Sequence, residues 1–391
     1  MNMQKNNTQQ PAQHKMRIRW FRVLLLFAFV AICAALLIGA THQLLQIIQP
    51  SAGNPVAVNA PVISLQGRNE TDPAANDSAN TNTNANANTN TNANANANAN
   101  ANANANANEV TTHGIHDVNL IGFTAQLHSR YALLINLATD EILFAQSASE
   151  PVYPASLVKM MTALVALEHI EDVHHNIPIT LAMIEYAHQA NAATAGFRAG
   201  DTPSALDALF GLMLPSGAEC ALALATYVAG SQENFANLMN DMAQSLGMTQ
   251  THFTNATGLH DAAQQTTVYD LSLLLRSGLH NDVFADLITR ARYATRPLNS
   301  NQDGITIHSS MFARMPTASF DGGRILGGRT GFTDEAGQNL ASFAQIGDTQ
   351  FMLITTGAQT NGAHMSRALH IEDAMSVYQH LSHHLAAASA R

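Results

Sequence analysis

The hydrophobic and polar positions divide the chain into regions of different character. Residues 23–40 are apolar and uncharged, and apolar positions continue to residue 48. Residues 74–108 are almost entirely Asn, Ala and Thr, without an apolar face that offsets the entropy of ordering. Beyond this tract, apolar residues recur at strand and helix spacings. The pattern predicts a basic tail at 1–22, a transmembrane anchor at 23–49, a disordered linker at 50–115 and a folded domain at 116–391.

The apolar run has the length of a membrane-spanning helix, for which roughly 17–25 residues are needed. The tail before it contains basic residues and no acidic one, namely Lys5, Lys15, Arg17, Arg19 and Arg22. Basic flanks stay on the cytoplasmic side, so we expect the folded domain outside the cell, tethered to the membrane. Cleavage as a signal peptide near Gly39-Ala40 is the alternative, and it predicts a secreted domain.

The folded region begins and ends with strands and has helices between them. Strands are predicted at 130–137, 142–145, 338–345 and 350–356, the last two joined by a turn at Gly347-Asp348. Helices are predicted from Ser156 to about His169, from an N-cap at Thr202, after Ser216, from Ser231 to Leu246, at 267–278 and from Ser366 to about His384. This order predicts an α+β fold in which the first and last segments share one antiparallel sheet.

Charge and composition narrow the functional classes. The net charge is -10, and after the tail 13 basic residues face 28 acidic ones, which argues against a nucleic-acid partner. Among the 18 histidines, His380, His383 and His384 form the densest group. They lack the flanking ligands of a zinc motif, so an exposed helix is favoured over a metal site. Cys33 and Cys220 are not expected to pair.

A Ser-x-x-Lys pattern is the main candidate for chemistry. After Lys15 the only lysine is Lys159, three residues after Ser156, while every other basic residue beyond the tail is arginine. Residues three apart share a helix face, so the amine can reach the hydroxyl. A serine is a nucleophile only when a base takes its proton, and a buried lysine loses its own proton readily, whereas arginine does not.

The segments PASLVKMMTAL, LMLPSGAEC and GGRTGFTDEAGQNL together resemble the serine-type D-alanyl-D-alanine carboxypeptidases, the low-molecular-weight penicillin-binding proteins. The motifs stand here as SLVK, SGA and RTG, and the resemblance covers nearly all of residues 125–385, including the stretch LGMTQTHFTNATGLHD. It implies a β-lactamase/transpeptidase-like domain with the active site between the sheet and a helical cluster. Only a few residues follow the last predicted helix, so we expect no second domain after the catalytic one.

The resemblance also implies a role for each motif residue. Ser156 is the expected nucleophile on the carbonyl between two D-alanines of a peptidoglycan stem peptide, Lys159 its general base and Ser216 the relay to the leaving amine. Arg329 and Thr330 are expected to hold the terminal carboxylate. The strand through Gly331 and Phe332 is expected to pair with the substrate, with the backbone N–H groups of Ser156 and Phe332 as oxyanion hole. Penicillin-type β-lactams are the expected covalent inhibitors, and neither a metal nor an organic cofactor is implied.

Two positions depart from the family pattern. Arg329 replaces the usual lysine of the third motif, which keeps the charge and a bidentate grip on carboxylate. Ala218 replaces the asparagine of the second motif, whose amide contacts substrate and lysine. The missing asparagine leaves a catalytically weak or silent wall-binding module as one alternative to a carboxypeptidase. A β-lactamase is the second alternative, because it uses the same acyl chemistry.

Overall fold

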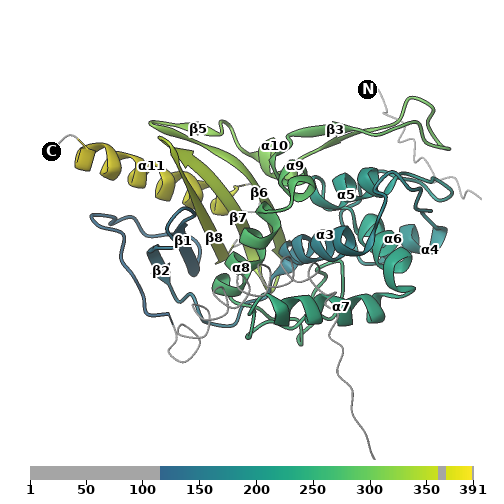
Figure 1. Cartoon of the computed structure of the whole chain (residues 1–391), viewed down its shortest axis with the longest axis horizontal. Coiled ribbons are helices and arrows are strands. Elements are labelled where there is room, and N and C mark those ends of the chain that lie inside the picture. Colours follow the sequence, from purple (N-terminus) through teal and green to yellow (C-terminus); the bar gives the residue numbers. More distant parts are fainter. Residues whose placement is uncertain (1–114, 360–366, 390–391) are drawn as a thin grey trace, which may run out of the picture. The chain divides into compact units, whose positions relative to one another are not determined.

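The computed structural model describes residues 115–359 and 367–389 (Figure 1). The predicted tail, the predicted anchor and nearly all of the predicted linker lie outside these residues. Within the described part of the chain, no helix combines the length and the apolar character required to cross a bilayer.

One antiparallel sheet forms the centre of the domain. Its strands are β1 (Tyr131–Asn136), β2 (Ile142–Gln146), β5 (Ser319–Phe320), β6 (Gly323–Thr333), β7 (Gly337–Ile346) and β8 (Thr349–Ala358), in the spatial order β2-β1-β8-β7-β6-β5. The first strand pairs with the last, antiparallel along its whole length, which confirms the prediction that the two ends of the domain share a sheet. The predicted hairpin is also confirmed, since β7 and β8 are joined through Gly347 in the left-handed conformation.

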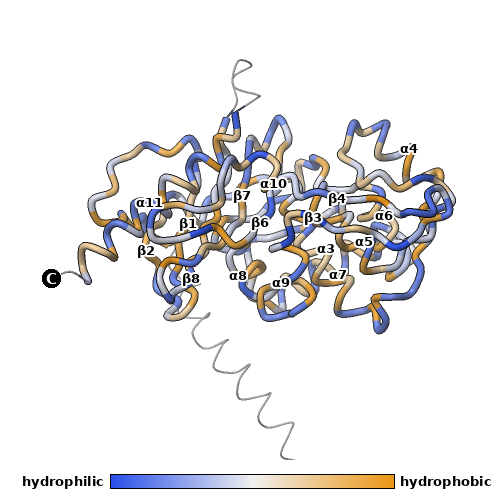
Figure 2. Tube along the Cα trace, turned by 90° about the horizontal axis from the view of Figure 1, so that it is seen from above, coloured by the Kyte–Doolittle hydropathy of each residue, from blue (hydrophilic) through white to orange (hydrophobic). Residues whose placement is uncertain are grey.

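Helices cover both faces of the sheet. They are η1 (Ala155–Leu157), α3 (Val158–His169), α4 (Leu181–Gln189), α5 (Ala205–Met213), α6 (Ala218–Ala229), α7 (Gln232–Ser245), α8 (Val268–Leu279), α9 (Asp282–Thr289), α10 (Ser310–Arg314) and α11 (Leu369–Ser389). A short hairpin of β3 (Arg292–Ala294) and β4 (Thr306–His308) lies between α9 and α10 in the chain. Figure 2 shows hydrophobic and hydrophilic positions alternating along these elements, as expected where one face of each is buried.

The central strand β7 explains how the two layers are held together. Its Ala341 and Phe343 pack into the larger apolar core with the helices α3 to α9, and its Leu340 and Ala344 pack into a smaller core with α11. Successive side chains on a strand point to opposite faces, so β7, with a core on each side, is buried along almost its whole length. The result is the α+β domain that the element order predicts, with α11 on one face of the sheet (Figure 1).

Most helix boundaries agree with the predicted caps, and one does not. Ser231 caps α7 as predicted, and Thr267, predicted as the first residue of a helix, is the cap of α8; each side chain accepts a hydrogen bond from the third residue of its helix. The predicted cap at Thr202 is wrong, because Ser204 caps α5 in a reciprocal capping box with Asp207. The last helix continues beyond the predicted end at His384 to Ser389, since the intervening leucine and alanines favour helix.

Candidate active site

The predicted nucleophile lies on a strained turn where η1 enters α3. Ala155, directly before Ser156, has a φ of 48°, a left-handed conformation that side-chain-bearing residues rarely adopt. The buried Asn339 on β7 holds this turn from below, because its amide nitrogen donates to the carbonyl oxygens of Tyr153 and Pro154 at 3.0 and 3.2 Å. The turn therefore exposes Ser156 at the start of a helix while its neighbours are fixed to the sheet.

Lys159 lies one helical turn from Ser156, as the i, i+3 spacing predicts. Its Nζ is 3.4 Å from Ser156 Oγ and also donates to the carbonyl oxygen of Thr257. Only 2% of the lysine is exposed. Burial, together with the charge of Arg329, lowers the pKa of Lys159 to about 7, although Glu219 opposes this shift. A buried amine with this pKa is available in its neutral form near neutral pH.

Ser216 reaches the same hydroxyl from the turn between α5 and α6. Its backbone is also left-handed, with a φ of 77°, and its Oγ donates to Ser156 Oγ at 2.9 Å. Ser156 is thus contacted by Lys159 on one side and by Ser216 on the other. The second motif therefore meets the first across 60 residues of chain.

Arg329 on β6 completes the cluster from the sheet. Its guanidinium is 1% exposed, donates through Nη1 to Met213 O at 3.1 Å and through Nη2 to Ser216 Oγ at 2.6 Å, and leaves Nε without a partner. Burial lowers the pKa of Arg329 to about 9, so it remains charged at neutral pH. The charge lies beside the predicted relay, within reach of any group that binds there.

The rest of the third motif brings the strand against the nucleophile turn. A Cβ on Gly331 would lie 3.1 Å from Ser156 N and 3.2 Å from Pro154 O, so glycine allows this approach. Phe332 is 40% exposed. Residues 329–333 pair with β7 on one side only, and no strand within the described residues covers their outer edge.

These contacts unite four of the predicted motif residues, namely Ser156, Lys159, Ser216 and Arg329. The sequence profile of the D-alanyl-D-alanine carboxypeptidases matches residues 119–360, most of the same domain. The chain belongs to the D-alanyl-D-alanine carboxypeptidase family.

Curated relatives of this family match the folded domain over most of its length. The chain is 30% identical over 242 residues to the D-alanyl-D-alanine carboxypeptidase DacC of Escherichia coli, covering 60% of this chain and 57% of that protein. It is 24% identical over 232 residues to DacF of Bacillus subtilis, covering 59% and 58%. The chain thus spans less than two thirds of the length of these relatives.

Solved structures of D-alanyl-D-alanine peptidases share the fold. A DD-transpeptidase from a Streptomyces strain superposes with a TM-score of 0.57 at 23% identity, covering 66% of this chain and 97% of that one. A D-alanyl-D-alanine carboxypeptidase from Mycobacterium tuberculosis gives 0.57 at 24% identity, covering 67% and 94%. The antiparallel sheet packed with helices is therefore the fold of this carboxypeptidase family.

Thr330, the remaining polar residue of the third motif in this carboxypeptidase-family domain, has a partner that sequence motifs did not reveal. Its Oγ1 lies 3.1 Å from the hydroxyl of Ser310, at the start of α10, and the backbone N–H of Ser310 donates to Leu214 O. Ser310 lies 20 residues before Thr330 in an unremarkable segment, so only the tertiary fold identifies it.

The segment between the second and third motifs supplies the carbonyl that Lys159 contacts. The side-chain oxygen of Asn255 accepts hydrogen bonds from the backbone N–H groups of Thr257 and Gly258 and from the Thr257 hydroxyl. This turn fixes the direction of the Thr257 carbonyl. The family resemblance of this stretch thus has a structural basis, although no residue of it was singled out from the sequence.

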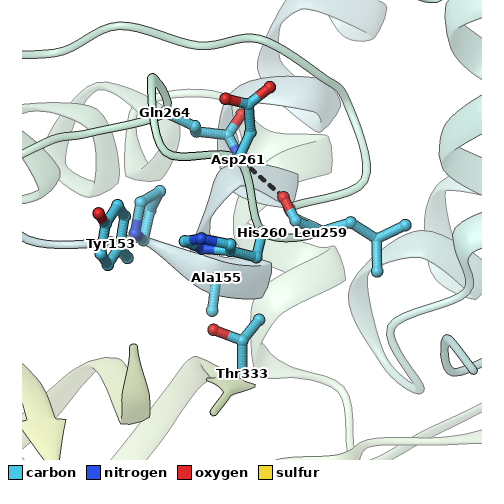
Figure 3. A pocket seen from close by; sticks show the side chains of 9 residues that line it. Tyr153, Ala155, Leu259, His260, Asp261, Gln264 and Thr333 are labelled. Carbon is cyan, nitrogen blue, oxygen red and sulfur yellow. Dashed lines mark hydrogen bonds between the residues drawn. The ribbon is translucent and has the colours of Figure 1, made fainter. Parts of the chain in front are cut away.

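A small cavity lies beside the nucleophile turn (Figure 3). It is lined by Tyr153, Pro154, Ala155, Gly258, Leu259, His260, Asp261, Gln264 and Thr333. The rings of Tyr153 and His260 meet edge to face with centroids 4.8 Å apart, and His260 lies 3.8 Å from a carboxylate oxygen of Glu335. Its lining includes Ala155, directly before the predicted nucleophile, and Thr333 at the end of β6.

Ala218, where the family has asparagine, begins α6 and is buried. Its backbone N–H donates to Ala193 O, and its methyl group offers no polar contact to Lys159. The next residue, Glu219, is fully buried and accepts hydrogen bonds from the N–H groups of Ala195 and Gly196. The second motif therefore lacks the asparagine amide of the family, and the residue that follows this position carries a buried carboxyl group.

Proposed function

We propose that this chain is a serine-type D-alanyl-D-alanine carboxypeptidase, which removes the terminal D-alanine of peptidoglycan stem peptides through an acyl-enzyme. One observation supports this most directly: Ser156 Oγ is contacted by both Lys159 Nζ and Ser216 Oγ. A hydroxyl between an amine of lowered pKa and a second hydroxyl has a base for its proton and a path for returning it.

In the proposed acylation, Ser156 Oγ attacks the carbonyl carbon of the penultimate D-alanine and its proton moves to Lys159 Nζ. The backbone N–H groups of Ser156 and Phe332 stabilise the oxyanion, an effect of about 2.7–4 kcal/mol per donor. The proton then passes through Ser216 to the leaving nitrogen, the C–N bond breaks and D-alanine departs. Water attacks the resulting ester carbonyl and gives a proton to Lys159. The bond between the acyl carbon and Ser156 Oγ then breaks, Lys159 returns the proton to this oxygen, and the shortened peptide leaves with a terminal carboxylate.

Binding of the substrate carboxylate is assigned to the other end of the cluster. Arg329 carries a charge beside Ser216, and Thr330 has a hydroxyl on the adjacent residue. Charge-assisted hydrogen bonds from a guanidinium suit a carboxylate. The uncovered edge of residues 329–333 suits an extended peptide added as a strand.

The same geometry supports β-lactams as covalent inhibitors, since they offer a strained amide and a carboxylate to the same groups. For localisation we propose that the domain faces the cell wall, anchored by residues 23–49 and spaced from the bilayer by residues 50–115. This rests on the hydropathy pattern and the basic tail, with secretion after cleavage as the other outcome.

The test is labelling of the purified full-length chain with a fluorescent penicillin, followed by assay of D-alanine release from a pentapeptide. We expect label on the parent chain and none on Ser156→Ala, while Ser231→Ala, which removes a hydroxyl at the cap of α7, keeps its label. D-alanine release with slow loss of label supports the carboxypeptidase.

Other outcomes support the alternatives. Rapid turnover of penicillin without D-alanine release identifies a β-lactamase. A folded chain that takes no label refutes the proposal and supports the silent wall-binding module, for which Ala218 is the specific motive.

A further inference from the structure

Glu219 is a buried acidic group that the proposed reaction does not use. It is the only acid of α6, in the first turn, where the helix N-terminus favours negative charge. Its Oε1 accepts the N–H groups of Ala195 and Gly196 at 2.6 and 3.2 Å. Its Oε2 is equally buried and has no hydrogen-bond partner. A half-satisfied buried carboxyl group is costly, and such groups are retained where they serve a function.

The unpartnered oxygen lies against the second motif. A Cβ built on Gly217 would lie 2.8 Å from Gly211 O and 3.0 Å from both Glu219 Oε2 and Cys220 Sγ, so glycine at this position leaves room for the carboxyl group beside the residue that follows Ser216. Glu219 therefore combines one oxygen that holds the backbone of residues 195–196 with a second, unpartnered oxygen beside Gly217 of the second motif.

The unpartnered carboxylate can influence the protonation of Lys159 through the charges that surround this amine. Three titratable side chains act on Lys159: Arg329 from β6, and Glu219 and Cys220 from α6. Burial raises the pKa of the Cys220 thiol well above its usual value, so Cys220 remains neutral. Arg329 is the only fixed positive charge and Glu219 the only group that can be negative. When Lys159 takes a proton, the net charge of the cluster reaches +1 if Glu219 is ionised and +2 if Glu219 is neutral.

We propose that Glu219 is a positioning residue for acylation, whose buried carboxyl group balances Arg329 and thereby sets the proton affinity of Lys159. It supplies electrostatically part of what the second motif lost with Ala218. The role in acylation rests on the proposed function, whereas the effect of Glu219 on Lys159 depends only on the burial and contacts of the carboxyl group. Burial raises the pKa of Glu219 itself above its ordinary value.

The lysine content allows a direct test. The chain contains only Lys5, Lys15 and Lys159, so a full-length chain labelled with lysine carrying ¹³C at Cε gives three signals. The two lysines of the tail are expected to titrate near the ordinary value of about 10.4. The NMR titration of Lys159 therefore reports its proton affinity without any reaction.

We expect Glu219→Gln, which keeps the acceptor for Ala195 and Gly196, to lower the Lys159 midpoint by about one pH unit, tenfold in the proton equilibrium. Glu219→Asp, which keeps the charge, is expected to restore at least half of that shift. Asp201→Asn is the matched control, because Asp201 is an equally buried acceptor of backbone N–H groups that does not act on Lys159.

The outcome distinguishes this inference from the proposed function. An unchanged Lys159 midpoint in a folded Glu219→Gln chain overturns the inference even if penicillin labels the parent. A shifted midpoint in a chain that no penicillin labels upholds the inference and refutes the reaction. Where labelling occurs, its acid limb should move to lower pH in Glu219→Gln and its maximal rate should fall about tenfold, because a weaker base accepts the Ser156 proton less readily.

Discussion

Arg329 donates a 2.6 Å hydrogen bond to Ser216, the residue whose hydroxyl in turn donates to Ser156. The charge of the third motif is thus connected to the nucleophile through the second. A lysine at this position offers a point charge, whereas the guanidinium contacts Ser216 and the Met213 carbonyl at once. The substitution of arginine for lysine therefore keeps the charge and adds a fixed orientation.

Removing this charge should weaken substrate binding more than the chemistry. We expect Arg329→Gln to lower kcat/KM about 10- to 100-fold, mainly through KM, because a charge-assisted hydrogen bond contributes about 1.5–3 kcal/mol. Arg329→Lys should stay within about tenfold of the parent. Arg324→Gln, an exposed arginine on the same strand, is the control. Steady-state release of D-alanine measures all three, and an unaffected Arg329→Gln would refute the assignment.

The rate of acylation should depend on pH through Lys159. Only the neutral amine can take the Ser156 proton, and its pKa is lowered to about 7. We therefore expect penicillin acylation to rise with pH along a single limb with its midpoint near 7. A midpoint above 9 would show that Lys159 has the affinity of an ordinary lysine and is not the base. Stopped-flow labelling between pH 5 and 9 is the measurement.

The burial of Lys159 should lower the free energy of unfolding at pH values below its unfolded-state pKa. Its folded-state pKa of about 7 lies below the unfolded value of 10.5, so the unfolded chain binds more protons between these values and stability rises with pH there. Lys159→Met, which leaves the Thr257 carbonyl unpaired, should still raise the free energy of unfolding by about 2–4 kcal/mol at pH 6. The gain should shrink as pH approaches 10.5. Urea unfolding at pH 6 and 9.5 tests this, and an equal gain at both would contradict it.

Asn339 should be as important to the nucleophile turn as the motif residues. It is fully buried, donates to the carbonyls of Tyr153 and Pro154, and accepts from Gly357 N. Asn339→Asp keeps the acceptor but removes both donors, so we expect a loss of about 2–4 kcal/mol of stability and at least tenfold slower labelling. Asn299→Asp, an exposed asparagine with one backbone contact, is the control. Denaturation and labelling are compared on the same preparations.

Gly331 should tolerate no side chain in the active enzyme. An added Cβ would meet Ser156 N at 3.1 Å, tighter than nearly all real contacts, so β6 and the nucleophile turn must separate by a few tenths of an ångström. We expect Gly331→Ala to slow acylation about 10- to 100-fold, since small misplacements of catalytic groups have effects of this size. Arg324→Ala, at an exposed position of the same strand, should label normally. Normal labelling of Gly331→Ala would show that the oxyanion hole lies elsewhere.

Short-range sequence patterns were enough to predict several helices and strands and the nucleophile with its base. The lone Lys159 three residues after Ser156 predicts both a helix face and a base, because one helical turn is enough to bring the two side chains together. The two segments on either side of the turn at Gly347-Asp348 predicted the paired strands β7 and β8, and the cap at Ser231 predicted the start of α7. Thr202 was predicted as a cap because proline follows it, whereas the reciprocal hydrogen bonds between Ser204 and Asp207 decide the boundary.

Tertiary structure decided which residues meet across the chain. Asn339, Ser310 and the Thr257 carbonyl act on the motif residues from 20 to 186 positions away, so no periodicity or short spacing indicates them. The proposed role of Glu219 was not predictable from the sequence either, because it depends on the burial of the side chain and on the unpartnered oxygen beside Gly217. The sequence by itself determined the elements and the nucleophile with its base, because those depend on neighbours within one or two turns. Only the folded chain determined the electrostatic environment, because burial and long-range contacts set the proton affinity of Lys159.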